Sequence, residues 1–186
     1  YVVVTNAHFY ADTPSGKAKL IAHRGVHQMY SPKGVGRDTC TATRIYKPTH
    51  QVLENTQSSI ERALYDGAYM VEVDVAPTKD GQMVLFHDWT VDCRTNGKGE
   101  TRDLTLAQLK ALDIGYGYTA DGGKTFPFRG RVGQMPTVRE GLYSSPHNGL
   151  FFNFKSKDAG EADLLSAQLK AAGRDPIKSR DAVYGA

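Results

Sequence analysis

Two histidines, two carboxylates and one arginine in this chain are residue types that could together hydrolyse a phosphate ester. His23 and His87 can take up and release protons near neutral pH. Glu72 and Asp74 are two positions apart, so in an extended strand they face the same side and could hold a hard cation such as Ca²⁺ or Mg²⁺. Arg24 supplies a forked positive charge that suits a phosphate. The combination predicts metal-assisted hydrolysis of a phosphodiester.

Three apolar segments lead into these residues and indicate the elements that must position them. Residues 20–22 precede His23, residues 69–71 precede Glu72, and residues 83–86 precede His87. Taken alone, a histidine in a strand is more often a core or surface residue, and paired acids usually form a solvated face. Apolar runs that each end in ionisable groups are instead typical of a β/α barrel, which presents its chemistry at the carboxyl ends of its strands.

An ordered series of short motifs covers most of residues 20–157. The motifs occupy residues 22–25, 53–56, 67–68, 71–75, 78–81, 86–88, 94–99, 135–137 and 152–155. In this order the sequence resembles the glycerophosphodiester phosphodiesterase family, in its bacterial extracytoplasmic form, because an ordered set is far more specific than any single motif. The resemblance implies an α/β fold, namely a TIM-type (β/α)8 barrel of the phospholipase-C-like phosphodiesterase kind.

The resemblance also implies roles for individual residues. His23 and His87 would be the acid/base pair, although the sequence does not distinguish which of them protonates the leaving group. Arg24 and Lys155 would contact the phosphate of the substrate. The implied reaction is the hydrolysis of glycerophosphodiesters to glycerol 3-phosphate and an alcohol.

Glu54, Asn55 and Asn153 lie in the same motifs. Glu54 and Asn55 would orient the catalytic groups or complete the ligand shell, and a simple acid at a helix start is an equal interpretation of Glu54. The family usually has a third metal carboxylate two positions before the strand lysine, where this chain has Asn153. An amide oxygen carries no charge, so we expect Asn153 to be a weaker third ligand beside Glu72 and Asp74.

The length of the chain limits how much of a barrel it can form. With 186 residues, 40% hydrophobic and 23% charged, the chain has the composition of one globular domain over residues 1–186. A complete β/α barrel usually needs about 250 residues. We therefore expect a barrel truncated after about five strands, with the carboxyl-terminal strands missing. Further chain or a second copy would then have to close the sheet.

Apolar patterning gives the expected elements. Strands are predicted at residues 19–23, 68–75, 83–87 and 150–155, with another beginning near 181. Helices are predicted from residue 54 to 67, at 105–112, from 137 onward and at 161–171. Residues 26–52 and 115–134 read as long loops, the second as a lid. A tight turn at Asp80 and Gly81 would place Asp74 opposite His87.

Charge and cysteine content limit the partners and the compartment. The net charge of +3 is too small and too evenly spread to indicate nucleic-acid binding, and no apolar run is long enough for a transmembrane segment. The two cysteines, Cys40 and Cys93, both fall in loops at the catalytic end. They could be unrelated thiols, but a disulfide is favoured, which predicts a periplasmic or otherwise extracytoplasmic protein.

Two other functions fit the sequence less well. A related barrel phosphodiesterase acting on lysophospholipid or sphingomyelin would need an apolar lip, and the loop at residues 26–52 is polar. A catalytically silent phosphate-binding fragment fits the short length but leaves the intact pairs of histidines and carboxylates unexplained. A small-molecule glycerophosphodiester is therefore the expected partner.

Overall fold

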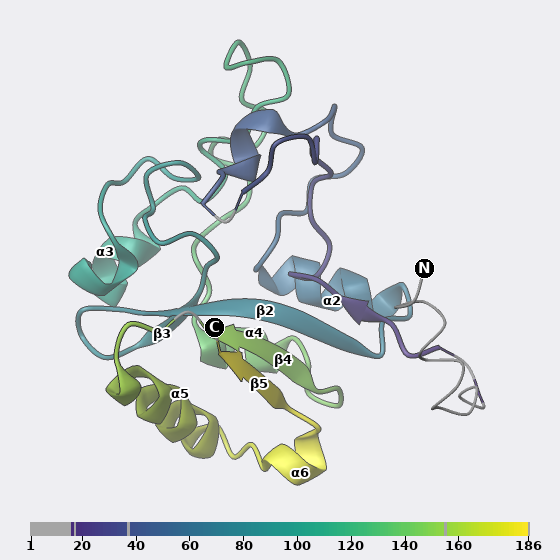
Figure 1. Ribbon diagram of the computed structural model, residues 1–186, viewed down its shortest axis with the longest axis vertical. Helices are drawn as coiled ribbons and strands as arrows, with labels where there is room; N and C mark the ends of the chain where they lie inside the picture. Colours follow the sequence, from purple (N-terminus) through teal and green to yellow (C-terminus); the bar gives the residue numbers. More distant parts are fainter. Residues whose placement is uncertain (1–15, 17, 37, 155, 186) are drawn as a thin grey trace, which may run out of the picture.

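A computed structural model describes residues 16, 18–36, 38–154 and 156–185, and its centre is one β-sheet (Figure 1). The strands are β1 (Ile21–Ala22), β2 (Met70–Pro77), β3 (Met83–Leu85), β4 (Leu150–Phe154) and β5 (Ala182–Gly185). The sheet order is β1-β2-β4-β5 with parallel neighbours, and β3 pairs antiparallel with β2 off this path. Parallel strands joined through helices are the pattern expected of a β/α barrel.

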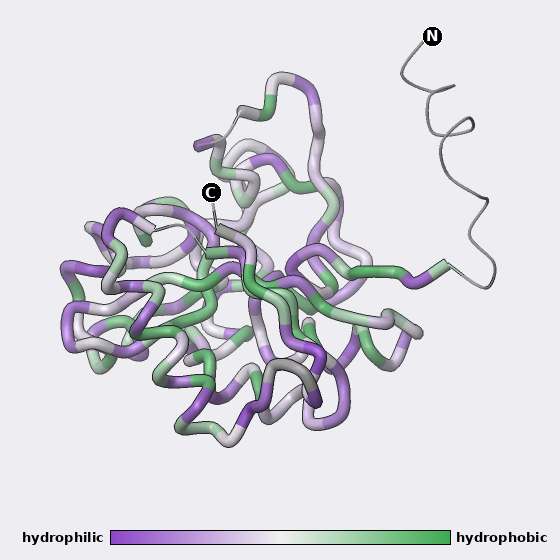
Figure 2. The backbone as a smooth tube through the Cα atoms, turned by 60° about the horizontal axis from the view of Figure 1, so that its bottom comes forward, coloured by the Kyte–Doolittle hydropathy of each residue, from purple (hydrophilic) through white to green (hydrophobic). Residues whose placement is uncertain are grey.

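The two faces of the sheet differ in chemistry. On β2 the apolar side chains of Val71, Val73 and Val75 belong to a buried core, and on β4 Leu150, Phe152 and Phe154 do the same. This core includes residues of the helices α2 (Gln57–Tyr65), α4 (Val138–Tyr143) and α5 (Ala159–Ala171). Because side chains alternate along a strand, the residues between them lie on the opposite face. The hydrophobic segments that include β2 and β4 lie in the middle of the molecule (Figure 2).

Three helices begin with the same capping arrangement. A threonine side chain accepts a hydrogen bond from the backbone three residues on, whose own side chain bonds back to the threonine. The pairs are Thr56 with Ser59 in α2, Thr105 with Gln108 in α3 (Leu106–Lys110), and Thr137 with Glu140 in α4. The remaining helical elements are η1 (Thr41–Arg44), η2 (Thr101–Asp103) and α6 (Pro176–Ser179).

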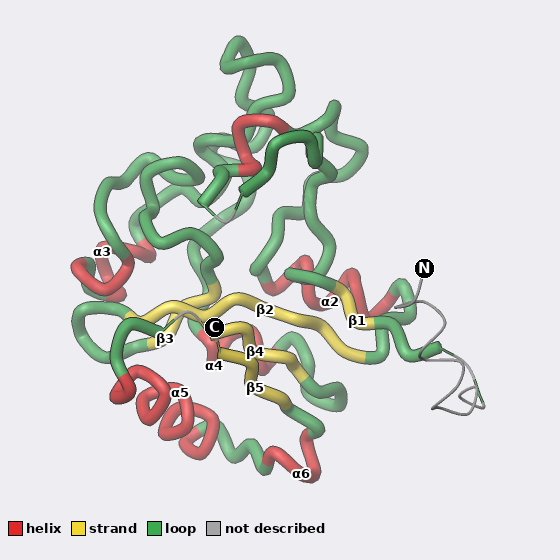
Figure 3. The backbone as a smooth tube through the Cα atoms, in the orientation of Figure 1, coloured by secondary structure: helices red, strands yellow, loops and turns green. Residues whose placement is uncertain are grey.

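The two long loops form a second packed region beyond the sheet, and it is mostly without regular structure (Figure 3). Its buried apolar residues come from both loops and from the segment just before α2. They are Ala42, Ile45, Leu53, Tyr118 and Phe128. A disulfide joins Cys40 to Cys93, with 6.3 Å between their Cα atoms. The insertion at residues 26–52 is therefore fixed in place by apolar contacts and a covalent bond.

The described residues contain the five strands expected of a truncated barrel, and β3 pairs antiparallel with β2 across the expected turn. The structure corrects the register of this hairpin. The turn spans residues 78–82, since the Thr78 backbone donates to the Gln82 carbonyl at 2.8 Å and Pro77 pairs with Met83. This register brings Phe86 to Asp74, whose carbonyl accepts from Phe86 at 3.0 Å. The prediction that His87 lies opposite Asp74 was wrong by one residue.

Among the described residues, no helix combines the length and the hydrophobicity that crossing a membrane requires.

Candidate active site

A cluster of polar side chains occupies the face of the sheet that the helices leave uncovered. Asp74 of β2 is its centre and is 1% exposed. The Asn55 side chain bonds Asp74 twice, donating from Nδ2 to Oδ2 at 2.9 Å and accepting from the Asp74 backbone N–H at 2.9 Å. Asn153, which is paired with Asp74 in the parallel register, donates from Nδ2 to Oδ1 at 3.0 Å. Asn55 has a positive φ of 55°, a conformation that asparagine tolerates better than most residues.

The turn after β1 brings Arg24 to the same carboxylates. The Arg24 backbone N–H donates to Oε2 of Glu72 at 2.7 Å, and its Nε lies 3.2 Å from Oδ2 of Asp74. Gly25 lets the turn pack on α2, because a Cβ there would lie 2.7 Å from the Ser59 carbonyl oxygen. Arg24 is thus held beside Glu72 and Asp74 by its backbone as well as by charge.

Glu72 and Asp74 form a buried pair of like charges. Burial, and then the neighbouring Asp74 carboxylate, raise the pKa of Glu72 from 4.5 to about 7. Oε1 of Glu72 is buried without a hydrogen-bond partner. A divalent cation would satisfy that oxygen and relieve the repulsion, and the oxygen donors suit Ca²⁺ or Mg²⁺. The residues present therefore fit such an ion, although the described residues contain no group of three or more His, Cys, Asp or Glu side chains that could hold one.

His23 follows β1 and is exposed at the edge of this cluster. Its ring meets that of His27 edge to face, with 6.1 Å between the centroids. Partial desolvation and the adjacent Arg24 charge lower the pKa of His23, and the charge of His87 acts in the same direction. A lowered pKa favours the neutral imidazole at neutral pH, the form that can accept a proton.

His87 lies in the loop after β3 and is oriented by a neighbouring acid. Its Nδ1 lies 2.6 Å from Oδ1 of Asp88, and Oδ2 of Asp88 accepts from Nε of Arg94 at 2.8 Å. Burial alone would raise the pKa of Asp88, but the bond with His87 and the Arg94 charge outweigh it and lower the pKa. His87 also lines a cavity of about 300 Å³ together with Trp89 and both cysteines of the disulfide.

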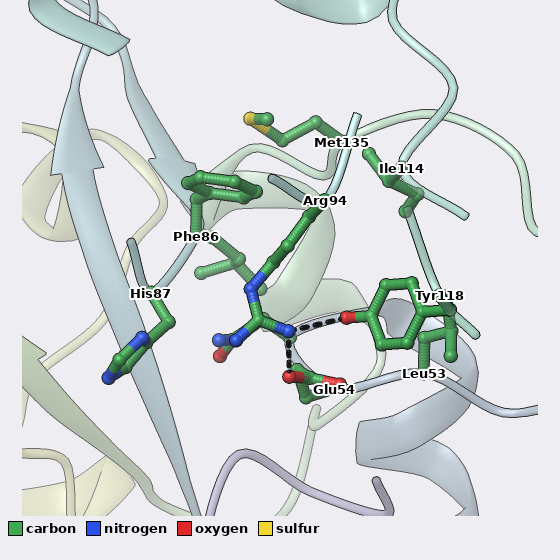
Figure 4. Close-up of a pocket in the computed structure, with 10 residues that line it drawn as sticks. Leu53, Glu54, Phe86, His87, Arg94, Ile114, Tyr118 and Met135 are labelled. Atoms are coloured by element: carbon green, nitrogen blue, oxygen red, sulfur yellow. Dashed lines mark hydrogen bonds and ion pairs between the residues drawn. The ribbon is translucent and has the colours of Figure 1, made fainter. Parts of the chain in front are cut away.

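Glu54 faces Arg94 in the structure. Figure 4 shows the Arg94 guanidinium between Glu54 and Tyr118, with bonds from Nη1 to Oε1 of Glu54 and to the Tyr118 hydroxyl. Burial would raise the pKa of Glu54, but the Arg94 charge, together with hydrogen bonds from the backbone and from Tyr118, lowers it overall. That Glu54 and Asn55 orient the catalytic groups or complete the ligand shell stays a prediction, and in the structure the Glu54 side chain contacts Arg94. The Asn55 backbone N–H donates to the Arg24 carbonyl at 3.1 Å, and its side chain bonds Asp74.

The structure therefore brings the predicted residues together in two groups. Arg24, Asn55, Glu72, Asp74 and Asn153 form the cluster on the sheet face. His87 and Glu54 belong to a second cluster built on Arg94. Lys155 lies outside the described residues. Sequence reasoning assigned no role to Arg94, Asp88 or Thr41, although Asp88 and Arg94 stand in the motifs at 86–88 and 94–99.

Comparison with known proteins gives the family of this chain. The model of the glycerophosphoryl diester phosphodiesterase family matches residues 23–182. Glycerophosphodiester phosphodiesterase 1 of Rattus norvegicus is 36% identical over 134 residues, which are 72% of this chain and 38% of that protein. The glycerophosphodiester phosphodiesterase of Caldanaerobacter subterraneus is 50% identical over 64 residues, 34% of this chain and 26% of that protein. This chain thus corresponds to well under half the length of these relatives.

Solved structures show the same fold. The glycerophosphoryl diester phosphodiesterase domain of a Mycobacterium tuberculosis protein superposes with a TM-score of 0.67 at 23% identity, over 91% of this chain and 53% of that one. An Oleispira antarctica phosphodiesterase, solved in complex with the product sn-glycerol-3-phosphate, has a TM-score of 0.56 at 26% identity, over 84% of this chain and 52% of that one. The predicted TIM-type barrel class and the family resemblance are confirmed.

Proposed function

Because this chain belongs to the glycerophosphoryl diester phosphodiesterase family, we propose that it carries the catalytic site of an enzyme that hydrolyses glycerophosphodiesters to glycerol 3-phosphate and an alcohol. The observation that carries the proposal is the position of two histidines at the end of the sheet that holds the buried carboxylates, where the charges of Asp74 and His87 both act on His23. His23 follows β1, and β3 returns along β2 so that His87 comes back toward Asp74. Both a proton acceptor and a proton donor are thus available at one end of the sheet.

The histidines would move the protons of the reaction. An ionised carboxylate can only accept hydrogen bonds, so the bond to Asp88 places a proton on Nδ1 of His87. Nε2 of His87 is then the nitrogen that exchanges a proton with substrate while this bond persists. Neutral His23 can accept a proton from an attacking water, which divides the acid and base roles between the two rings.

Charged groups on the sheet face would hold the phosphate. Arg24 provides the positive charge, and Lys155 is proposed as a second one. Ca²⁺ or Mg²⁺ would be held by the carboxylate oxygens of Glu72 and Asp74, with Asn153 beside them. Such an ion, when bound, neutralises the non-bridging oxygens of a phosphodiester and makes attack on phosphorus easier.

The disulfide supports a proposal about compartment. Cys40 and Cys93 are bonded in the structure, and such bonds persist in oxidising surroundings. We place the protein outside the cytoplasm, in the periplasm or an equivalent space.

Release of glycerol 3-phosphate from glycerophosphocholine tests the proposal, using the protein that carries this chain. Turnover should be lost with chelator and return with Ca²⁺ or Mg²⁺. Lysophosphatidylcholine and sphingomyelin serve as parallel substrates, and faster turnover of either would replace the proposed substrate class. Full turnover in a verified metal-free preparation would overturn the role given to Glu72 and Asp74.

A further inference from the structure

Arg94 is a buried arginine whose hydrogen bonds join three separate segments of the chain. It is 2% exposed, and its guanidinium makes five bonds, which matches its five N–H groups. Nε and Nη2 donate to the two oxygens of Asp88 at 2.8 and 3.3 Å. Nη2 also donates to Thr41 Oγ1 at 3.1 Å, and Nη1 donates to Tyr118 at 2.7 Å and to Glu54.

These bonds fix Asp88 as well as Arg94. Both oxygens of Asp88 are engaged by one planar fork, so the carboxylate cannot rotate without breaking a charged bond. The same Oδ1 accepts from Nδ1 of His87 at 2.6 Å. With His87 protonated on both nitrogens, the series His87, Asp88, Arg94, Glu54 alternates in charge and is neutral overall.

We propose that Arg94 is a positioning residue for His87. Because Arg94 donates hydrogen bonds to both oxygens of Asp88, it sets the ring orientation of His87 and keeps the proton of His87 on Nδ1. The inference rests on the proposed function, in which His87 exchanges a proton through Nε2. Arg94 itself stays buried and touches no substrate. Its action on the reaction passes through Asp88 alone.

The surroundings of Arg94 keep the fork in one place. Thr41 and Arg94 directly follow Cys40 and Cys93, so the disulfide and the Thr41 bond tie the same two segments together. Tyr118 is 2% exposed and comes from the second loop. Three segments thus hold the guanidinium from different sides, an arrangement suited to keeping a catalytic group within the small displacements that proton transfer tolerates.

The tautomer of His87 gives a direct test. In protein labelled with ¹⁵N-histidine, with the His87 signals assigned from His87→Gln, the neutral ring should be protonated on Nδ1. In Arg94→Met the signals should move toward the Nε2-protonated form. An unchanged Nδ1-protonated ring in Arg94→Met would overturn the proposal.

Kinetics give the second test. For Arg94→Met we expect kcat to fall roughly 10²-fold with KM nearly unchanged, the size expected for a displaced catalytic group. Arg94→Lys keeps the charge but not the fork, so it should recover part of the loss. Asp88→Asn should lose as much as Arg94→Met, and the double variant should lose no more than either single variant, since both act through one bond. If the loss of kcat in the double variant were the product of the losses in the two single variants, the proposal would be overturned.

Arg174 is the matched control. It is another largely buried arginine, with an 11% exposed side chain, and it holds Asp181 through Nε at 2.9 Å and Nη2 at 2.8 Å. Arg174→Met should lower thermal stability and leave the His87 tautomer unchanged. If Arg94→Met does not fold, Tyr118→Phe and Arg94→Lys replace it, and wild-type tautomer and kcat in both would overturn the proposal. If the wild-type protein turns over no glycerophosphodiester, the proposed function fails, while the tautomer measurement still decides the role of Arg94.

Discussion

Two buried glutamates of this chain have opposite electrostatic surroundings. Glu54 is paired with the Arg94 guanidinium, which lowers its pKa, whereas Glu72 lies beside the Asp74 carboxylate, and its pKa is raised to about 7. The Arg94 guanidinium donates hydrogen bonds to both carboxylates of its cluster, Glu54 and Asp88. The pair on the sheet face also has, among the described residues, one arginine for two carboxylates, but Oε1 of Glu72 is buried without a hydrogen-bond partner. The fully hydrogen-bonded Arg94 cluster is suited to hold a shape, and the pair with the unsatisfied oxygen is suited to bind a cation.

The largest expected effect tests whether the Arg94 cluster takes part in catalysis at all. His87→Ala should reduce the turnover of glycerophosphocholine by about 10²–10⁴-fold, the usual contribution of a general acid or base. His23→Ala should do the same from the other side of the site. His147→Ala, an exposed histidine in the turn before β4, is the control and should leave kcat and KM unchanged. Near-normal rates for His87→Ala would reduce the Arg94 cluster to a structural element.

Removing the charge of Glu54 tests its ion pair with Arg94 directly. Glu54→Gln leaves the buried Arg94 with Asp88 as its remaining carboxylate, so the loss of unfolding free energy should be smaller than the about 3–5 kcal/mol that an uncompensated buried charge costs. Urea unfolding at pH 7 measures the loss. Arg62→Gln, which removes an exposed ion pair with Asp66, is the comparison and should cost less than about 1 kcal/mol. Equal losses in the two variants would contradict the assigned role of Glu54.

The disulfide should stabilise the second region more than the sheet. Its loop spans 53 residues, for which the chain-entropy model gives about 4 kcal/mol. Reduction, or the double change Cys40→Ser and Cys93→Ser, should therefore lower the unfolding free energy by roughly that amount and loosen the segments around Thr41 and Arg94. Thiol labelling with intact mass before and after reduction shows whether the bond is present. Two free thiols in protein isolated under oxidising conditions would contradict it.

In metal-free protein at pH 8, Glu72→Gln should raise the stability of the folded state, whereas Glu54→Gln should lower it. The raised pKa of Glu72 means that the folded state holds this proton more tightly than the unfolded chain. Its contribution to stability is therefore present below about pH 4.5 and is lost as the pH rises through about 7. Glu72→Gln should then unfold at a higher temperature than the wild type at pH 8, with little difference at pH 4.5, both in chelator.

Added Ca²⁺ completes this comparison. It should raise the unfolding temperature of the wild type at pH 8, because a ligand that binds only the folded state stabilises it. The gain should be much smaller in Glu72→Gln. If Glu72→Gln is less stable than the wild type at pH 8 in chelator, the repulsion between Glu72 and Asp74 is already compensated by neighbouring groups in the metal-free protein.

The same contrast explains what could be predicted from the sequence. The strands and helices follow from apolar periodicity, and the groups on β2 follow from the two-residue spacing of Glu72 and Asp74, which local geometry determines. The Arg94 cluster depends on contacts among residues 41, 54, 88, 94 and 118. No local pattern encodes those contacts, because loops with positions fixed by packing and a disulfide bring them together.

The prediction of the β2–β3 register was wrong for a local reason. Asp80 and Gly81 suggest a two-residue turn, but the Thr78 side chain bonds both Asp80 and the Gln82 backbone and closes a longer one. One residue of difference moves a side chain to the other face of a sheet. His87 lies beyond the end of β3, in a loop where Asp88 orients its ring.

The smallest expected effect concerns Asn153, which lies beside the carboxylate pair on the sheet face. Its Nδ2 now donates to Asp74, so it partly satisfies the pair without changing the net charge. Asn153→Glu adds a third carboxylate, and the number of charged ligands sets much of the affinity of such sites. The affinity for Ca²⁺ or Mg²⁺ should therefore rise by about tenfold or less at pH 8. Asn153→Leu removes the amide without adding charge and serves as the control. Calorimetric titration with each metal measures the change. A large loss of affinity in Asn153→Glu, with none in Asn153→Leu, would place residue 153 outside the ligand shell, and the pair Glu72 and Asp74 would then have to hold the cation alone.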